Sequence, residues 1–398
     1  MGIVFYNKKT VRDIDVVNKR VLVRVDYNVP RDENGNVTDL TRVNGTLPTL
    51  QYLLKRGAKV VLMSHLGRPK GERNLKYSLE NLTPHLARLL DAPVHFCPDC
   101  IGPEAEKMAA ELKSGEVLLL ENLRFYKEEE KNDPEFAAKL AKLGEIFVSD
   151  AFGAVHRAHA SLVGVAAHLP AVSGFLLEKD LVMMSKLLAQ PQRPCVAVMG
   201  GAKVDDKIGV IKNLLPSVDR LLIGGAMANT FLNALGYDMG ASKVSPEFID
   251  LVKELLEQDV EKKIVLPQDL VVADSFSADA EHCNVSVDNV PEGWMALDMG
   301  EKTIATYSAL IKSAKCVIWN GPMGVFEMPA FAKGTEAIAV ACAKTQGSTI
   351  VGGGDSLAAI DQAGVGYMIT HISTGGGSTL EYLEGRHLPG VEVLQDAE

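Results

Sequence analysis

The sequence has no long apolar run, no signal peptide and neither of the two common nucleotide-binding signatures. Among its 398 residues, 47% of them hydrophobic, no apolar stretch is long enough to cross a bilayer. The N-terminal "MGIVFYNKKT" lacks a signal-peptide pattern and the serine or threonine that N-myristoylation requires at position 6. We therefore expect a cytoplasmic protein with no membrane partner.

Cysteine is also scarce, and six scattered residues do not form a disulfide framework. Cys97 and Cys100, with His95 nearby, form the one cluster that resembles a metal site. A zinc site requires a second pair of ligands at matching spacing, and none follows. Reduced, inert thiols are the favoured interpretation, and zinc is the weaker alternative.

Arginine is nearly missing from the second half of the chain. Residues 1–188 contain 11 arginines, with 26 Lys and Arg against 24 Asp and Glu, whereas 189–398 contain 3 arginines, with 15 against 27. The net charge of −10 argues against a nucleic-acid partner. Because arginine suits bidentate binding of carboxylates and phosphates, the first half is expected to bind anions.

Short β-branched runs alternate with helical patterns along the whole chain. The length exceeds one ordinary core, and runs that are apolar on both faces suit buried parallel strands. Asp133 and Pro134 mark a helix start, and the same order of cap and proline recurs at 83–90 and 245–258. A helix over 172–194 would connect two α/β domains with doubly wound, Rossmann-like parallel sheets. The runs lie at 19–27, 58–66, 116–123, 145–152, 195–201, 220–226, 315–322 and 349–355.

In the first half, polar residues follow the predicted strands. Parallel sheets bind ligands beyond the carboxyl ends of their strands, so these side chains should share one edge. The residues are Asp26, Asn28, Arg42, His65, Arg68, Arg124 and Arg157. His156 and His159 are spaced to bind a metal, but the gathered guanidiniums would repel a cation. A site for a small polyanion is favoured, and solvated loop histidines are the alternative.

In the second half, glycines follow the strands. The segments are "VMGGAKVDDK", "IGGAMANTF", "IWNGPMGVFE", "IVGGGDS" and "HISTGGGSTLE". Strand, glycine and helix in succession let backbone N–H groups approach phosphate, although a single glycine run could mark only a tight turn. With Lys203, Lys207 and the Mg²⁺-suited Asp355, the repetition indicates a nucleotide. Neither G-x-x-x-x-G-K-[ST] nor G-x-G-x-x-G is present. A hinged phosphotransferase is the simplest inference.

Eight segments from about residue 20 to the C-terminus together resemble phosphoglycerate kinase. They are "RVDYNVP", "SHLGRPKG", "ENLRFY", "DAFGAVHRAHAS", "GGAKVDDKI", "IWNGPMGVFE", "VGGGDS" and "HISTGGGS". The resemblance implies reversible phosphoryl transfer between 1,3-bisphosphoglycerate and Mg·ADP, giving 3-phosphoglycerate and Mg·ATP, in a glycolytic monomer.

The resemblance also implies roles for matching residues. Asp26, Asn28, Arg42, His65, Arg68, Arg124 and Arg157 would bind the phosphoglycerate. Gly201, Ala202, Lys207, Gly225, Asn320, Pro322, Glu327, Gly352, Gly353, Gly354, Asp355 and Ser356 would bind the nucleotide, with Glu327 at the ribose and Asp355 at Mg²⁺. Arg42, Lys203, Gly354 and Gly377 would act on the group in transfer.

The implied domains are a phosphoglycerate-binding domain at 1–171, a hinge helix at 172–189, a nucleotide-binding domain at 190–377, and a segment at 378–398 that returns to the first domain. Because the nucleophile would be an ionised carboxylate, no general base is expected. The chain departs from the usual pattern at Tyr27, Ala226 and Gln268, which puts only fine nucleotide preference in doubt. A non-catalytic binder of phosphorylated metabolites and a kinase acting on acetate or carbamate are the alternatives.

Overall fold

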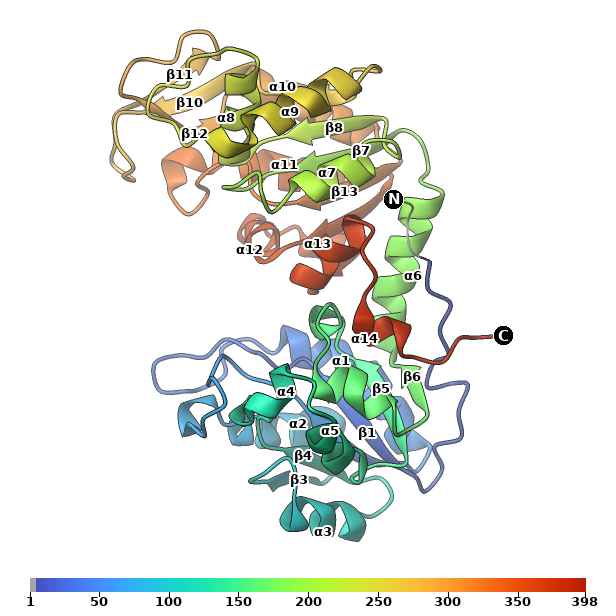
Figure 1. Ribbon diagram of the computed structural model, residues 1–398. Helices are drawn as coiled ribbons and strands as arrows, with labels where there is room; N and C mark the ends of the chain where they lie inside the picture. Colours follow the sequence, from blue (N-terminus) through green and yellow to red (C-terminus); the bar gives the residue numbers. More distant parts are fainter. Residues whose placement is uncertain (1–4) are drawn as a thin grey trace. The chain divides into compact units, whose positions relative to one another are not determined.

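In the computed structural model, which describes residues 5–398 apart from the side chains of 186–189, the chain divides into two compact units (Figure 1). The first unit contains Phe5–Val182 and His387–Glu398, and the second contains Met183–Arg386. The helix α6 (Phe175–Ala189) spans the division. Residues 1–4 of the predicted first domain lie outside the described residues.

The returning C-terminal segment is shorter than predicted. Residues 378–386 lie in the second unit, because α13 (Gly377–Leu383) packs against α7 (Ile208–Leu214) of that unit. The return begins at His387, where α14 (Pro389–Glu392) packs on the first unit through Gly390, whose N–H donates to Val155 O at 2.9 Å. The predicted start at 378 is corrected to 387.

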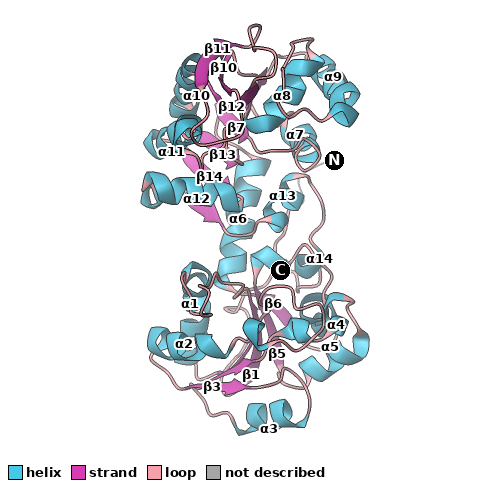
Figure 2. Cartoon of the chain, turned by 90° about the vertical axis from the view of Figure 1, so that its left-hand side faces the viewer, coloured by secondary structure: helices cyan, strands magenta, loops and turns pink. Residues whose placement is uncertain are grey.

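The first unit is built on a six-stranded parallel sheet with the order β3-β4-β2-β1-β5-β6. Figure 2 shows α1 and α2 on one face of this sheet and α4 and α5 on the other. The strands are β1 (Arg20–Val25), β2 (Lys59–Met63), β3 (Val94–Cys97), β4 (Val117–Leu120), β5 (Ile146–Asp150) and β6 (Ala171–Ser173). The helices are α1 (Thr41–Lys55), α2 (Thr83–Leu90), α3 (Pro103–Glu111), α4 (Lys127–Glu130) and α5 (Pro134–Ala141).

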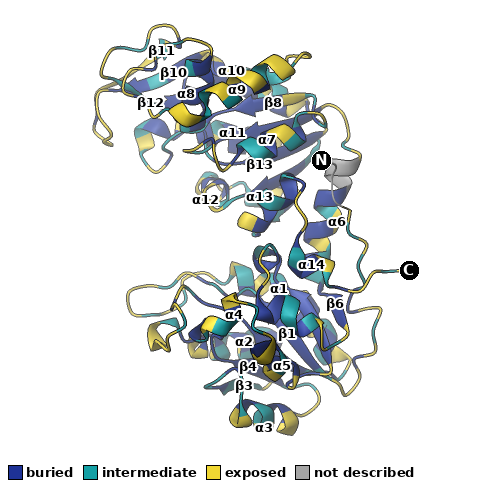
Figure 3. Cartoon of the chain, viewed as in Figure 1, coloured by how far each residue is buried: buried dark blue, intermediate teal, exposed yellow. Residues whose placement is uncertain are grey.

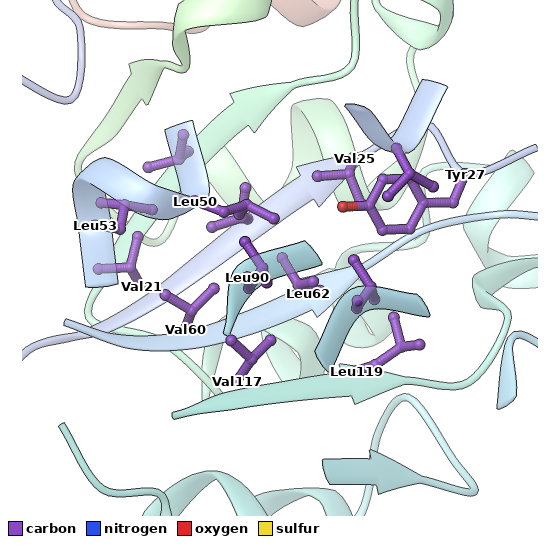
Figure 4. Close-up of a cluster of buried hydrophobic side chains, with 14 of the residues drawn as sticks. Val21, Val25, Tyr27, Leu50, Leu53, Val60, Leu62, Leu90, Val117 and Leu119 are labelled. Atoms are coloured by element: carbon purple, nitrogen blue, oxygen red, sulfur yellow. The ribbon is translucent and has the colours of Figure 1, made fainter. Parts of the chain in front are cut away.

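The core of the first unit lies between the sheet and its helices (Figures 3 and 4). Leu50 and Leu53 of α1 are fully buried in one cluster with Val21 and Val60 of the sheet. Burying both faces of the sheet favours the continuous apolar strands that were read from the sequence. Tyr27 packs in this cluster, and its hydroxyl lies 2.9 Å from Thr46 Oγ1, so its buried polar atom is satisfied.

The second unit contains a six-stranded parallel sheet, in the order β15-β14-β13-β7-β8-β9, and a three-stranded antiparallel sheet, β11-β10-β12. The strands of the larger sheet are β7 (Cys195–Met199), β8 (Arg220–Ile223), β9 (Ile264–Val265), β13 (Cys316–Asn320), β14 (Ser348–Gly352) and β15 (His371–Ser373). Those of the smaller sheet are β10 (Asp269–Ala273), β11 (His282–Ser286) and β12 (Met295–Met299). The remaining helices are α8 (Gly225–Ala234), α9 (Ile249–Gln258), α10 (Glu301–Ser313), α11 (Lys333–Lys344) and α12 (Gly354–Ala363).

Two doubly wound parallel sheets confirm the predicted fold class, and each of the eight predicted runs contains a strand. The sequence did not reveal the short edge strands or the antiparallel sheet, where β11 is exposed and polar. The Asp133 cap is confirmed by hydrogen bonds to the N–H groups of Glu135 and Phe136. The cap at 83 was wrong, because a 3₁₀ turn leads directly into α2. No helix among the described residues is long and apolar enough to span a membrane.

Candidate active site

The carboxyl ends of β1 and β2 in the first unit bring a carboxylate, a guanidinium and an imidazole together. Asp26 directly follows β1 and pairs with Arg42 at the start of α1. His65 follows β2, and its Nε2 lies 4.0 Å from Asp26 Oδ1. Burial acts to raise the pKa of Asp26, but the surrounding imidazole and guanidinium groups outweigh it and lower that pKa. Asp26 therefore remains a carboxylate that orients Arg42.

Hydrogen bonds between side chains and backbone join the loops after β1, β2 and β4. Asn28 Oδ1 accepts from Gly67 N at 2.8 Å, and Arg124 Nη1 donates to Gly67 O at 2.9 Å. Arg68 follows in the same loop and is exposed. Gly67 has φ of +63°, and a Cβ there would lie 2.5 Å from the Tyr77 ring, so the turn requires glycine. Asn28 and Arg124 are thus both held against the turn at Gly67.

The loop after β5 carries Arg157. Burial lowers the pKa of Arg124, Glu130 opposes that shift, and the positive charge of Arg157 adds to it. Burial, followed by Arg157, lowers the pKa of His156 to about 4. Burial, followed by Arg24, lowers the pKa of His159 to about 3. These imidazoles stay neutral at pH 7 among fixed positive charges, which suits an anion better than a cation.

The metal alternatives gain no support from the described residues. Within 5–398, no three His, Cys, Asp or Glu side chains gather as a metal-binding group. Cys97 and Cys100 are both buried, and burial raises the pKa of each thiol. Raised pKa values disfavour the thiolate that metal binding and oxidation both need.

In the second unit, most of the predicted nucleotide residues line one polar cavity of about 630 Å³. Its glycines come from the loops after β7, β13 and β14 and from the start of α13. The predicted residues in its wall are Gly201, Ala202, Lys203, Lys207, Asn320, Pro322, Gly353, Gly354, Asp355, Ser356 and Gly377. Gly225 and Glu327 line the cavity described next instead. Gly352 lines neither cavity, since it ends β14 and packs against Thr379, where a Cβ would lie 2.8 Å from Thr379 Cγ2.

A second cavity of about 550 Å³ adjoins the first and shares Gly201, Ala202, Pro322 and Asp355 with it. Gly225, Ala226 and Glu327 contribute to its wall. Much of the remaining wall is apolar and comes from Leu270, Phe276, Met295, Ala296, Leu297 and Val325. A polar cavity beside an apolar one suits a ligand with a charged chain and a flat, weakly polar ring.

Close backbone packing explains the glycines between these cavities. Gly225 begins α8 with φ of +67°, and a Cβ there would lie 2.6 Å from both Gly201 N and Gly201 O. Gly201 N donates in turn to Pro322 O at 2.9 Å. No other residue could occupy position 225 without moving the loop after β7.

The wall of the polar cavity carries both basic and acidic groups, namely Lys203, Lys207, Arg386, Asp205, Asp206, Asp355, Glu381 and Glu384. Lys207 Nζ donates to Asn320 Oδ1, and burial lowers the pKa of Lys207 to about 8, with opposition from Asp206 and then Asp355. Asp355 is exposed in the first turn of α12. A carboxylate such as that of Asp355, beside backbone N–H groups, is a ligand that Mg²⁺ uses when phosphate and water complete its coordination. The residues therefore fit a Mg²⁺–nucleotide complex.

Sequence reasoning missed two residues. Arg24 lies within β1, is fully buried, and places Nη2 3.0 Å from His65 Nδ1. A charge inside an otherwise apolar strand was the available signal. Phe276 lines the apolar cavity although it follows β10 in a polar segment, and a lone aromatic residue there gave little indication.

The chain is similar to known proteins of one family along nearly its full length. Residues 11–386 match the family model described as phosphoglycerate kinase. The chain is 58% identical to phosphoglycerate kinase of Moorella thermoacetica over 98% of this chain and 99% of that one. It is 57% identical to the Chloroflexus aggregans protein of the same name over 98% and 100%. The structure of phosphoglycerate kinase from Coxiella burnetii is similar with a TM-score of 0.88 and 40% identity, covering 97% of this chain and 98% of that one.

Proposed function

This chain belongs to the phosphoglycerate kinase family, and we propose that it transfers a phosphoryl group reversibly between 1,3-bisphosphoglycerate and Mg·ADP, giving 3-phosphoglycerate and Mg·ATP. It is thus an enzyme, a phosphotransferase whose acceptor is a carboxyl group. The proposal is carried by one observation: a single chain holds a cluster of guanidiniums at strand ends in one unit and a glycine-lined phosphate cavity in the other. We also propose that it acts in the cytoplasm as a monomer.

In the first unit, the arginines and His65 would bind the phosphate and carboxylate of phosphoglycerate. Bidentate guanidiniums match both groups in geometry and charge. Asp26 would orient Arg42 by their ion pair, and Asn28 would hold the loop of Gly67 and Arg68. Arg42 is the residue of this unit that we assign to the group in transfer.

In the second unit, the apolar cavity would receive adenine, with Glu327 at the ribose. The glycines after β7, β13 and β14, together with Asn320, Ser356 and Lys207, would surround the phosphates. Asp355 would hold Mg²⁺, which neutralises phosphate charge when bound. Lys203, Gly354 and Gly377 would present an exposed ammonium group and two backbone N–H groups to the transferred phosphoryl group.

The chemistry requires positioning and charge neutralisation instead of proton removal. With ATP as donor, the nucleophile is a carboxylate that is already ionised at pH 7, so no general base is needed. The transferring phosphoryl group spreads its charge over three oxygens, which fixed guanidinium and amide donors can stabilise. The same groups act in the reverse direction, in which the attacking oxygen of ADP is also ionised.

We further infer that the two units close when both ligands bind, because exclusion of water strengthens these electrostatic contacts and prevents hydrolysis. The helix α6 spans the division between the units and is the connection through which closure would occur. Small-angle scattering should therefore show a smaller radius of gyration with both ligands than with either one. An unchanged radius would remove this part of the proposal.

The function is tested by ATP consumption with 3-phosphoglycerate and Mg²⁺, coupled to an enzyme that removes the acyl phosphate. We expect saturable turnover that disappears when Mg²⁺ is chelated. Acetate and carbamate in place of 3-phosphoglycerate should give no turnover. Binding of both ligands without turnover would identify a non-catalytic binder instead.

A further inference from the structure

The two ring nitrogens of His65 face different partners. Nδ1 lies 3.0 Å from Nη2 of the buried Arg24, and Nε2 faces Asp26 Oδ1 at 4.0 Å. The charged groups that act on the ring are Arg24 in β1, Asp26 after β1, Arg42 in α1, and Arg124 in the turn η3 (Leu123–Phe125). The orientation of the ring is therefore set at its two nitrogens by Arg24 in β1 and by Asp26 directly after that strand.

The contact with Arg24 determines where the imidazole carries its proton. A guanidinium offers only donors, so Nδ1 must accept the hydrogen bond with a free lone pair. An imidazolium has no such lone pair, and a neutral ring with an unprotonated Nδ1 carries its proton on Nε2. Burial acts in the same direction, because it lowers the pKa of His65 well below its usual value.

Arg24 is itself held by a second buried layer. Its Nε donates to Ser161 Oγ at 2.9 Å, and that hydroxyl donates to Glu129 Oε1 at 2.5 Å. The Ser161 N–H donates to Glu129 Oε2 at 2.9 Å. Arg24, Ser161 and Glu129 are all fully buried, so these bonds are shielded from water and one acidic group compensates one basic group.

We propose that Glu129, acting through Ser161 and Arg24, is a positioning residue that holds His65 as the neutral Nε2–H tautomer. His65 then donates one hydrogen bond from Nε2 toward the substrate at neutral pH. That the acceptor is an anionic oxygen of phosphoglycerate rests on the proposed function, whereas the tautomer does not. An uncharged donor complements the arginines, since it adds direction to the site without adding repulsion among fixed positive charges.

The first experiment uses the wild-type protein without ligand. The chain is labelled with ¹⁵N-histidine, and the His65 signal is identified by NMR at pH 7 as the histidine signal that is lost in His65→Gln. That signal should show an unprotonated Nδ1 and a protonated Nε2. A protonated Nδ1 at His65, an even mixture of tautomers, or a doubly protonated ring would overturn the proposal. Because this measurement involves no turnover, it can fail or succeed independently of the kinase activity.

The second experiment loosens the support without touching His65. Ser161→Ala and Glu129→Gln should each raise KM for 3-phosphoglycerate by about threefold to tenfold, the effect of one hydrogen bond, with a smaller change in kcat. The His65 NMR signal should shift toward mixed tautomers in both variants. Ser149→Ala is the control, because Ser149 is equally buried and its hydroxyl makes no hydrogen bond within the described residues. A raised KM with an unchanged His65 tautomer would overturn the proposal.

Discussion

The two proposed anion sites are built from different chemical groups on similar sheets. The first unit presents charged side chains, such as Arg42, that are oriented by a carboxylate and supported by buried polar groups. The second unit presents backbone N–H groups beside glycines, and among its described side chains Lys207 is the one buried ammonium group. A site made of side chains depends on which groups are present, whereas a site made of backbone depends on how closely two loops approach. The following predictions test that difference.

The largest effect is expected from Arg42→Met. Removing the guanidinium assigned to the transferred group should lower kcat by about 10³-fold, because an arginine in this role neutralises transition-state charge. Steady-state kinetics with ATP and 3-phosphoglycerate measures the change. Arg88→Met, which removes an exposed arginine from α2, is the control and should retain normal turnover. A near-normal kcat in Arg42→Met would remove the assigned role.

The corresponding change in the second unit adds a single methyl group. Gly225→Ala places a Cβ 2.6 Å from the Gly201 backbone at φ of +67°, so the loops must separate. Strain of about 1–3 kcal/mol should weaken ADP binding by roughly tenfold to a hundredfold, as measured by calorimetry. Binding of 3-phosphoglycerate should not change.

A matched control lies at the other end of the same helix. Gly236 also has positive φ, +96°, but a Cβ there meets nothing within 4 Å. Gly236→Ala should therefore destabilise the fold by a similar amount of backbone strain without weakening ADP binding. Equal losses of affinity in the two variants would show that strain alone, rather than the approach of the loops, explains the effect.

A smaller effect is expected from pH. Because the pKa of Lys207 is lowered to about 8, this ammonium group loses its proton as pH rises from 7 to 9. A phosphate binds the protonated form better, so ADP affinity should fall above pH 8, by at most about tenfold per pH unit. Lys207→Arg, which stays charged, should bind ADP independently of pH over this range. A persistent fall in that variant would assign the titration to another group.

The smallest effect concerns the stability of the fold. Here the two units are alike, because each contains a buried carboxyl group with a raised pKa. Burial raises the pKa of Asp150 in the first unit and of Asp298 in the second to about 7. The folded chain keeps these protons up to about pH 7, whereas the unfolded chain loses them near pH 4. The free energy of unfolding should therefore fall as pH rises from 4 to 7.

The two carboxyl groups have different partners and can be tested separately. Asp150 accepts hydrogen bonds from the N–H groups of Leu176 and Leu177, and Asp298 accepts one from that of Gly334. Asp150→Asn and Asp298→Asn should each remove part of the decline. As pH rises from 4.5 to 7.5, the melting temperature of each variant should fall by roughly 3 °C less than that of the wild type, as followed by circular dichroism. If melting temperature plotted against pH gave parallel curves for wild type and variants, the raised pKa values would be contradicted.

Regular features were predictable from the sequence. The buried strands could be found because their apolar runs reflect burial on both faces, and the Asp133 cap because it depends on the next three residues only. The return of the C-terminal segment was placed too early, since the packing of α13 on α7 is a contact between distant parts of the chain. The antiparallel sheet was missed because an exposed strand such as β11 carries little apolar pattern.

The sequence by itself determined the alternating α/β order, the segregation of arginine and glycine between the two halves, and the residue types at the strand ends, because these are local properties of the chain. Only the tertiary structure decided which of these residues meet. It joined Arg24, His65, Ser161 and Glu129 into one buried network, and it set Gly225 against Gly201. Such contacts depend on which strands lie side by side in each sheet, and many of those neighbours are distant in sequence.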